Sequence, residues 1–287
     1  FKQKTAYEML RSLVGSEMCI RDRNKRLTDK VAVISGGTSG IGEATVELFV
    51  QEGAQVVFSG RSIEKGKAIA ERTGAVYFQA DVMSEEDIRG TIQAATDHFG
   101  GLDILFNNAG GSTKGPVETV TAAEIEYAWT LLFSSAVLST KYAVPCMKRR
   151  GGGCIINNSS IAGLRDNQGD LMYSSVKAAL THYSKLAGTR LGPEGIRVNV
   201  ISPGAIATPI FWGGPQVPLE DGEYEGKMGK LQRNLAKASP LGSSGVALDI
   251  ANGALFLASE EGRFINSHDL VIDGGRTSMF FEKPEQA

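Results

Sequence analysis

The sequence predicts a single-domain α/β fold, a doubly wound parallel sheet of the Rossmann type with about seven strands. Short apolar runs alternate with segments of helical periodicity through most of the 287 residues. A glycine-rich turn joins the first run to the first helix, and no linker or internal repeat divides the chain. This alternation is typical of parallel strands that crossover helices bury on both faces. In such folds the ligand lies beyond the carboxyl ends of the strands.

The elements follow one another in a regular order. After the first strand, Ile41, Ala44 and Leu48 recur on one face of a helix that Gly53 closes as a C-cap. The fourth helix is the longest, and we expect it to break only near Pro145, because proline cannot donate the helical hydrogen bond. Strands are expected at residues 31–34, 55–58, 76–78, 104–106, 154–156, 198–201 and 270–272, and helices at 41–52, 63–72, 85–99, 122–148 and 173–191.

Two segments depart from this rhythm. Residues 209–239 are rich in glycine, proline and charge and carry Phe211, Trp212 and Tyr224, so we interpret them as a lid over the ligand. Residues 12–23 resemble translated sequencing-adaptor read-through. We therefore interpret residues 1–26 as a non-native or disordered extension, with a frayed N-terminal helix as the alternative, and place the domain at residues 27–287.

Composition argues against several classes of function. The chain has 30 basic and 32 acidic residues and a net charge of -2, which gives no support to a nucleic-acid partner. No apolar run reaches the roughly 18 residues of a membrane span. Three cysteines without CxxC spacing and three scattered histidines predict neither disulfides nor a metal site, and a cytoplasmic location is expected.

A nucleotide-binding loop is predicted between the first strand and the first helix. Gly36 permits a tight turn, Gly40 lets the backbone approach a pyrophosphate, and Gly42 lets the helix pack closely on the sheet. The helix N-terminus then offers free N–H groups and a positive dipole end to the phosphates. The loop residues expected to bind the nucleotide are Ser35, Gly36, Thr38, Ser39, Gly40, Ile41 and Gly42.

The residues after the second strand are expected to determine whether the protein prefers NAD or NADP. Folds that bind NAD place an acidic residue there for the ribose 2′-hydroxyl, whereas this chain has Gly60 followed by Arg61. A guanidinium can bind a 2′-phosphate through two hydrogen bonds, so NADP is predicted, with NAD as the alternative. A solvated Arg61, or one stacked on adenine, would suit either cofactor, and Ser39 adds no second basic contact.

Further nucleotide contacts are expected at the ends of the third and fourth strands. Asp81 can accept a hydrogen bond from the adenine amino group, and small residues after Asn107 leave room for the ribose. An ordinary turn is the alternative interpretation of the two asparagines. The residues expected to take part are Asp81, Val82, Asn108, Ala109 and Gly110.

Three side chains indicate acid–base chemistry beside the nucleotide. Tyr173 and Lys177 are four residues apart and project from one face of a helix, and Ser160 precedes Tyr173 by 13 residues. An ammonium near a phenol favours the phenolate and is expected to lower the pKa of Tyr173 from its ordinary value of about 10. Ser160 can hydrogen-bond the same substrate oxygen. The three together suit the transfer of a proton and a hydride at a carbinol carbon.

Taken in order, these residues resemble the short-chain dehydrogenase/reductase family over residues 30–275. The resemblance implies that Tyr173 is the catalytic acid/base, that Ser160 positions the substrate oxygen, and that Lys177 binds the nicotinamide ribose and lowers the pKa of the tyrosine. It also implies that Thr208 binds the carboxamide and that Pro203, Gly204 and Ile206 line the same site. The matching motifs are Gly40 to Gly42, Asn107 to Gly110, Ser160, Tyr173 with Lys177, Asn199 before Pro203 and Gly204, and Asp273 to Gly275.

One position departs from the family pattern. The family usually has an asparagine in the long helix where this chain has Leu132. That asparagine is thought to hold a water molecule that links the lysine to bulk solvent, and leucine cannot form a hydrogen bond. We expect an active enzyme with an altered proton relay, in which Ser134 or Ser135 substitutes, protons take another path, or turnover is slower.

The predicted function is an NAD(P)-dependent oxidoreductase that moves a hydride reversibly between nicotinamide and a secondary alcohol or ketone. The alternatives are a reductase of 3-oxoacyl thioesters on a carrier protein and a nucleotide-binding redox sensor with little turnover. The first alternative calls for a basic rim, and the compact basic cluster of residues 148–150 precedes the fifth strand, away from the predicted site. A small-molecule substrate, no nucleic acid or membrane, and a homotetramer are expected.

Overall fold

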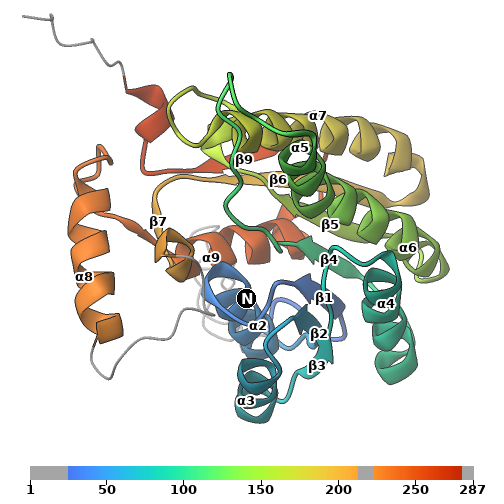
Figure 1. The fold of residues 1–287 in the computed structure, drawn as a ribbon. Helices are drawn as coiled ribbons and strands as arrows, with labels where there is room; N and C mark the ends of the chain where they lie inside the picture. The colour runs from blue at the N-terminus through green and yellow to red at the C-terminus, as the bar shows by residue number, and fades with distance from the viewer. Residues whose placement is uncertain (1–24, 213–222, 280–287) are drawn as a thin grey trace, which may run out of the picture.

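The computed structural model describes residues 25–212 and 223–279. Its centre is a seven-stranded sheet in the order β3-β2-β1-β4-β5-β6-β9, and every neighbouring pair in it is parallel (Figure 1). The single-domain doubly wound fold and its seven strands are thus confirmed. The strands are β1 (Val31–Ser35), β2 (Gln55–Gly60), β3 (Val76–Gln79), β4 (Ile104–Asn107), β5 (Gly153–Asn158), β6 (Ile196–Pro203) and β9 (Asp269–Ile272).

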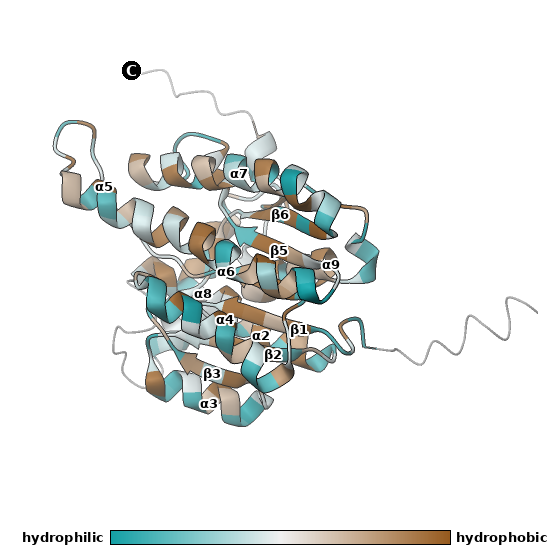
Figure 2. Cartoon of the chain, turned by 90° about the vertical axis from the view of Figure 1, so that its right-hand side faces the viewer, coloured by the Kyte–Doolittle hydropathy of each residue, from teal (hydrophilic) through white to brown (hydrophobic). Residues whose placement is uncertain are grey.

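Helices cover both faces of this sheet. One face is covered by α2 (Gly40–Gln51) and α9 (Ala247–Ala258), with α3 (Ile63–Thr73) packed against β2 and β3 at its edge. The other face is covered by α4 (Glu85–Phe99), α6 (Ser135–Arg149) and α7 (Leu171–Leu191). Each interface has its own apolar core, and the hydropathy colouring shows apolar strands between helices of mixed hydropathy (Figure 2). Burial on both faces explains why the strands are continuous apolar runs.

The strand order creates a crevice at the carboxyl edge of the sheet. The chain runs from β1 outward to β2 and β3, then returns to add β4 on the other side of β1. The connections after β1 and β4 therefore diverge, and ligands bind at such a switch point. The ends of β1, β4 and β5, at Ser35, Asn107 and Asn158, meet at this edge.

The long fourth helix differs from the prediction. It comprises α5 (Ala122–Trp129), a π-helical turn η1 (Thr130–Ser134) and α6, and Pro145 lies within α6 without breaking it. The predicted break near Pro145 was wrong, because Pro145 falls in the last turns, where losing one hydrogen bond does not interrupt the remaining ladder. The actual irregularity is the π turn, which contains Leu132. π turns are rare and are often found at functional sites.

A helix that the prediction omitted completes the core. α9 buries one side, including Ile250, Ala251 and Leu255, and its exposed side carries only two polar residues, Asp249 and Asn252, so the amphipathic pattern is weak. Its start is fixed by Asp249, whose Oδ2 accepts a hydrogen bond from the backbone N–H of Val246 at 2.8 Å. Asp249, set just before an alanine-rich apolar run, was the signal that could have predicted it.

The predicted lid contains regular structure in its described part. A short 3-10 turn, η4 (Pro209–Trp212), and a helix, α8 (Glu223–Ala236), lie on either side of residues 213–222, which are outside the described residues. A small two-stranded sheet pairs β7 (Ile206–Ala207) with β8 (Gly245–Val246), and α8 contacts these strands apart from the main body (Figure 1). No residue of α8 is buried.

The start of the described chain is anchored to the domain. Residues 1–24 of the predicted extension lie outside the described residues. Arg26 donates from its backbone N–H to Glu52 Oε2 at 2.9 Å and forms an ion pair with Glu261, and Leu27 is fully buried. Within residues 25–212 and 223–279, no helix combines the length and the hydropathy needed to cross a bilayer.

Candidate active site

The glycine-rich loop has the backbone geometry that the sequence predicts. Gly36 and Gly40 have positive φ angles of 67° and 56°, which L side chains rarely adopt. A Cβ on Gly42 would lie 2.1 Å from the carbonyl oxygen of Gly36, so only glycine lets α2 start this close to the loop. Ser39 is the N-cap of α2, and its hydroxyl makes no capping hydrogen bond. The loop thus leaves a hydroxyl and the helix N-terminus available to an anion.

A hydrogen-bonded network joins this loop to the end of β4. Ser35 Oγ accepts hydrogen bonds from the backbone N–H groups of Asn108 and Ala109 at 3.1 and 3.2 Å. Asn108 Nδ2 donates to the carbonyl oxygens of Ser35 and Gly36, both at 3.2 Å, and its Oδ1 accepts from Asn158 Nδ2 at 3.0 Å. Asn158 Oδ1 is buried without a partner among the described residues. It is an acceptor that a ribose hydroxyl can satisfy, so this wall of the crevice fits a nucleotide.

The end of β2 has no room for an acidic side chain. A Cβ on Gly60 would lie 2.7 Å from both Cγ2 and Oγ1 of Thr38, so Thr38 fills the space. Arg61 follows on the surface and has no hydrogen-bond or ion-pair partner in the described part of the chain. Ser62, the N-cap of α3, likewise makes no side-chain capping bond. A guanidinium and a hydroxyl without a capping hydrogen bond therefore follow the end of β2.

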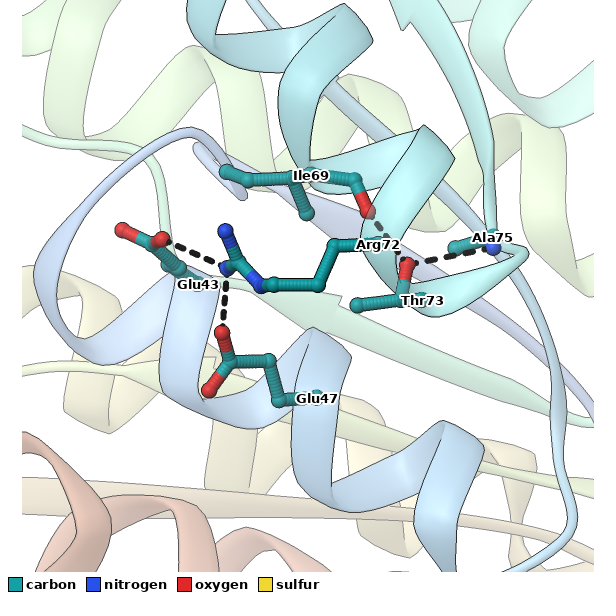
Figure 3. Close-up of polar contacts among 6 residues, drawn as sticks. All are labelled: Glu43, Glu47, Ile69, Arg72, Thr73 and Ala75. Atoms are coloured by element: carbon teal, nitrogen blue, oxygen red, sulfur yellow. Dashed lines mark hydrogen bonds and ion pairs between the residues drawn. The ribbon is translucent and has the colours of Figure 1, made fainter.

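The neighbouring arginine on α3 is engaged elsewhere. Arg72 Nη2 contacts Glu43 Oε1 at 3.0 Å and also pairs with Glu47, so it joins α3 to α2 (Figure 3). Thr73 closes the end of α3 by donating to the carbonyl oxygen of Ile69 at 2.7 Å and accepting from the N–H of Ala75 at 3.2 Å (Figure 3). Two carboxylates therefore hold Arg72, whereas Arg61 has no ion-pair partner among the described residues.

The remaining predicted nucleotide residues reach the same edge from three further connections. Asp81 Oδ1 accepts from the N–H of Met83 at 3.0 Å, which shapes the turn before α4, and Val82 borders a cavity beside Lys177. The loop after β6 crosses the glycine turn: a Cβ on Gly40 would lie 3.4 Å from Thr208 Cγ2. These residues lie at the carboxyl edge of the sheet, along with Gly110 after β4, Pro203 at the end of β6, and Gly204 and Ile206 after it.

The amino end of α7 is held by residues that the sequence analysis missed. Asp170 is the N-cap of α7, and its Oδ1 accepts from the backbone N–H of Tyr173 at 2.9 Å. Thr113, from the loop after β4, donates to both carboxylate oxygens of Asp170 at 3.2 Å. These bonds fix the first turn of α7, where Tyr173 lies. The N-cap spacing of an aspartate three residues before Tyr173 was readable in the sequence, whereas the partner Thr113 was not.

Ser160, Tyr173 and Lys177 form one group at the end of β5. The Ser160 hydroxyl lies close enough to the Tyr173 phenol to affect its pKa, and Lys177 Nζ lies 5.6 Å from the centroid of the Tyr173 ring. Lys177 is buried, with 5% of its surface exposed, and donates to the carbonyl oxygen of Asn158 at 2.6 Å. The β5 end is itself tied to α7, because Ser159 Oγ donates to the carbonyl oxygen of Lys177 at 3.0 Å.

The pKa values in this group differ from the expectation for the phenol. Burial raises the pKa of Tyr173, the nearby Ser160 hydroxyl opposes that rise, and the charge of Asp170 adds to it. Burial also lowers the pKa of Lys177 from 10.5 to about 8. The predicted lowering of the phenol pKa is therefore wrong for the protein without a nucleotide, because desolvation dominates and Asp170 adds a negative charge. At neutral pH the site holds a protonated phenol beside a mostly protonated lysine.

Leu132 lies at the wall of a small cavity behind this group. The cavity lies between the ends of β1, β4 and β5 and the helices α6 and α7. Leu132 is 2% exposed and offers no polar atom in its side chain. The residues that border the cavity are Ser35, Val82, Asn107, Ala109, Leu132, Ser135, Ala136, Ser139, Asn158, Lys177 and Leu180.

Two of the three residues in the basic cluster before β5 form ion pairs. Lys148 Nζ lies 2.8 Å from Glu194 Oε1, and Arg150 Nη2 lies 2.9 Å from Asp103 Oδ2. Both pairs lie at the amino end of β5, on the opposite edge of the sheet from Tyr173. This cluster gives no basic rim for an acidic carrier protein. No group of three or more metal-ligating side chains occurs within the described ranges.

Comparisons with known proteins agree with this geometry. Residues 36–277 match the family model described as enoyl-(acyl carrier protein) reductase. The chain is 36% identical over 255 residues to 2,5-dichloro-2,5-cyclohexadiene-1,4-diol dehydrogenase LinX of Sphingobium indicum, covering 87% of this chain and 97% of that one. It is 35% identical over 260 residues to the short-chain dehydrogenase reductase ATA1 of Arabidopsis thaliana, covering 89% and 95%.

Two further related proteins are named for reactions on small molecules. Trans-4-hydroxycyclohexanecarboxylate dehydrogenase of Sinomonas cyclohexanicum is 34% identical over 264 residues, covering 88% of this chain and 95% of that one. The solved structure of L-sorbose reductase from Gluconobacter frateurii, complexed with NADPH and L-sorbose, superposes with a TM-score of 0.78 at 30% identity, covering 90% of this chain and all of that one. Fold, glycine loop and matched length agree, and the chain belongs to the short-chain dehydrogenase/reductase family of NAD(P)-dependent oxidoreductases.

Proposed function

We propose that the protein interconverts a secondary alcohol and a ketone with NADP(H), using Tyr173 as the acid/base. The observation that carries this proposal is the Ser160, Tyr173 and Lys177 group at the carboxyl edge of the sheet, next to the glycine loop. A nicotinamide cofactor supplies or accepts the hydride when bound. The residues of this chain would then supply orientation and the proton.

The protonation states favour ketone reduction at neutral pH. A protonated Tyr173 phenol can donate its proton to the developing alkoxide, and the Ser160 hydroxyl can hydrogen-bond the same oxygen. Alcohol oxidation requires the phenolate, and the Lys177 ammonium stabilises that form electrostatically. Because the pKa of Lys177 is about 8, this support is present below pH 8 and is lost above it.

NADP is the proposed cofactor because of the residues after β2. Arg61 and Ser62 offer unengaged donors, and Thr38 occupies the space in which an acidic residue would bind the 2′-hydroxyl of NAD. The glycine loop and the orphaned Asn158 Oδ1 suit the phosphates and a ribose in either cofactor. The related sorbose reductase was solved with NADPH.

A cyclic alcohol is the proposed substrate class. Two of the relatives are named for reactions on six-membered carbocycles. In the proposed lid, the rings of Trp212 and Tyr224 meet edge to face with centroids 5.9 Å apart. The charge of Glu43 contributes, after burial, to a raised pKa of the Tyr224 phenol, which places the start of α8 near the amino end of α2. An aromatic wall there suits an apolar ring.

A substrate screen tests the proposal directly. NADPH and NADH oxidation would be followed with a panel of cyclic and acyclic ketones, and the reverse reaction with the matching alcohols. We expect turnover of at least one cyclic ketone and a preference for NADPH. Tight binding of NADPH without turnover of any ketone or alcohol in the panel would favour the redox-sensor alternative.

We also propose that the chain assembles into a homotetramer. Tyr127 on α5 and Leu171 and Leu186 on α7 are 45%, 53% and 45% exposed, which leaves apolar surface on two neighbouring helices. Light scattering after size-exclusion chromatography would give the mass in solution. A monomeric mass at micromolar concentration would contradict the proposal.

A further inference from the structure

The segment that follows β9 lies at the same edge of the sheet as the candidate active site. β9 is the parallel neighbour of β6, so the loops after these two strands leave the sheet side by side. The loops touch, because a Cβ on Gly204 would lie 2.6 Å from Asp273 Cα. Asp273 then accepts hydrogen bonds from the backbone N–H groups of Gly275 at 2.8 Å and Thr277 at 2.6 Å. These bonds hold the short 3-10 turn η6 (Arg276–Ser278) at the carboxyl edge.

Arg276 reaches from this turn to the loop that precedes α7. Its side chain is half-buried, and its Nε donates a hydrogen bond to Gln168 Oε1. The next residue of that loop packs against the phenol ring, since a Cβ on Gly169 would lie 2.9 Å from Tyr173 Cδ1. The guanidinium is therefore held by the residue adjacent to the one that touches the Tyr173 ring.

Gln168 holds this arginine without neutralising its charge. The amide of Gln168 is oriented, because its Nε2 donates to the backbone carbonyl oxygen of Asp166 at 3.4 Å and its Oε1 is left for Arg276. Among the described residues, Arg276 has no carboxylate partner. A carboxylate would bind the guanidinium more strongly than a neutral amide does. The amide therefore fixes the position of the guanidinium and leaves its charge available to a ligand.

The carboxylates at the ends of these two segments bind other donors. Asp170, which ends the loop before α7, accepts hydrogen bonds from Thr113 Oγ1 at 3.2 Å, and Asp273 accepts those of its own turn. The second arginine of the loop, Arg165, donates to the carbonyl oxygen of Met279 at 3.3 Å, which is also a neutral partner. Two guanidiniums with neutral partners make this edge attractive to an anion.

We propose that Arg276 binds a carboxylate of the substrate, so that the protein acts on a cyclic acid whose ketone or alcohol lies at Tyr173. A guanidinium carries five N–H donors in a rigid fork. Because Gln168 takes Nε, the two Nη groups remain, and their spacing matches the two oxygens of a carboxylate. Arg276 is then a specificity-determining residue, and Gln168 is its positioning residue. The inference deepens the proposed function, on which the place of the reacting carbon rests.

The first test compares two ketones that differ in charge. NADPH-dependent reduction of 4-oxocyclohexanecarboxylate is measured beside that of its methyl ester, which keeps the ring and the ketone but is neutral. We expect the wild-type protein to prefer the acid in kcat/KM. Arg276→Met should lose about 10–100-fold on the acid, mainly through KM, and should reduce the ester as the wild type does. Equal reduction of both ketones by the wild type, or an acid preference that survives in Arg276→Met, would overturn the proposal.

Two further variants separate direct binding from general attraction. Gln168→Glu places a carboxylate against Arg276 and should reduce the acid preference although the arginine is still present. Arg165→Met is the matched control, because it removes a guanidinium from the same loop at an exposed position. This control should keep the acid preference within about twofold, since solvent and salt screen an exposed charge. Equal losses in Arg165→Met and Arg276→Met would show general attraction only and would contradict a carboxylate site at Arg276.

Calorimetry tests the carboxylate site independently of turnover. Cyclohexanecarboxylate has no ketone and cannot react, so its binding to the protein saturated with NADP⁺ or NAD⁺ reports the site alone. We expect at least about tenfold weaker binding in Arg276→Met and unchanged binding in Arg165→Met.

The two kinds of failure are then distinguishable. If no ketone is reduced but cyclohexanecarboxylate binds in a way that depends on Arg276, the carboxylate site stands and the proposed reaction fails. If ketones are reduced but cyclohexanecarboxylate does not bind, or binds equally well to Arg276→Met, the proposed reaction stands and the carboxylate site is refuted. Urea unfolding of each variant shows that a loss of binding does not come from a loss of the fold.

Discussion

The two halves of the crevice are built by opposite means. On the β1–β4 side, the nucleotide wall depends on side chains that are absent: Gly36, Gly42 and Gly60 each border backbone or side-chain atoms closer than 3 Å to where a Cβ would lie. On the β5–α7 side, the wall depends on polar side chains that are buried, such as Lys177 and Asn158. In the first half, the same glycines serve both the packing of the fold and the binding of the nucleotide. In the second half, burying the polar side chains costs desolvation free energy, so selection for stability alone would not keep them.

Lys177→Met should have the largest effect, and it should affect stability and activity in opposite directions. We expect kcat to fall by at least about 100-fold, because the variant lacks the charge that supports the phenolate. Burial lowers the pKa of Lys177, so its protonated form is disfavoured in the fold. The destabilisation is present below pH 8, where folded and unfolded chains are both protonated, and fades as pH rises towards 10.5.

Stability measurements check this prediction. Lys177→Met should raise the free energy of unfolding at pH 7 by up to about 3 kcal/mol, and the gain should shrink as the pH rises from 8 to 10.5. Urea unfolding at several pH values gives both quantities. Lys67→Met, at an exposed position on α3, should change stability little. A less stable Lys177→Met at neutral pH would contradict the cost assigned to this lysine.

Gly42→Ala, in the β1–β4 half of the crevice, should reduce both stability and nucleotide binding. Its Cβ would meet the Gly36 carbonyl oxygen at 2.1 Å and Asn108 Nδ2 at 2.6 Å, so the loop and α2 must separate. We expect a loss of about 1–3 kcal/mol in unfolding free energy together with at least tenfold weaker NADPH binding. In Gly226→Ala on α8, where nothing lies within 4 Å of the new methyl, stability should be unchanged or increased. Equal effects of the two variants would refute the packing argument.

Arg61→Ala probes the edge of the nucleotide wall. The variant should bind NADPH about 10–100-fold more weakly while NADH binding stays the same, because it loses charge-assisted hydrogen bonds to the 2′-phosphate. Fluorescence titration with both nucleotides measures the ratio. Arg72→Ala provides the control, since Glu43 and Glu47 already hold that guanidinium. An equal loss for NADPH and NADH in Arg61→Ala would indicate adenine stacking instead.

Asp170→Asn, in the β5–α7 half of the crevice, should have the smallest effect, a shift in the pH dependence of the reaction. Asparagine can keep the N-cap of α7, but the variant removes the negative charge that helps to raise the pKa of Tyr173. The kinetic limb that reports the phenol should therefore move to lower pH in both reaction directions. Asp166→Asn, exposed in the same loop, should leave that limb in place. A shift to higher pH in Asp170→Asn would show that loop geometry, not charge, controls the phenol.

The contrast between the halves also explains what could be predicted from the sequence. Gly36, Gly40 and Gly42 mark the nucleotide wall by their spacing alone, because a missing Cβ has a local backbone reason. Tyr173 and Lys177 were found because four residues on a helix place them on one face. Such local rules recovered the strands and the crevice.

What the sequence did not reveal depends on contacts between distant segments. The hydrogen bonds from Thr113 to Asp170 and from Asn107 to Asn157 join separate connections. The π turn at Leu132 has no pattern of its own, and α9 carries only Asp249 and Asn252 as polar residues in an otherwise apolar run, so its polar side was easily overlooked. The rise in the pKa of Tyr173 likewise follows from burial, which spacing alone does not reveal.

Single-turnover kinetics of Tyr173→Phe with NADPH and an accepted ketone test the central claim most directly. The phenyl ring keeps the packing and removes the hydroxyl that meets Ser160. Hydride transfer should slow by at least about 100-fold while NADPH affinity stays the same. Transfer at the wild-type rate would show that another group gives up the proton.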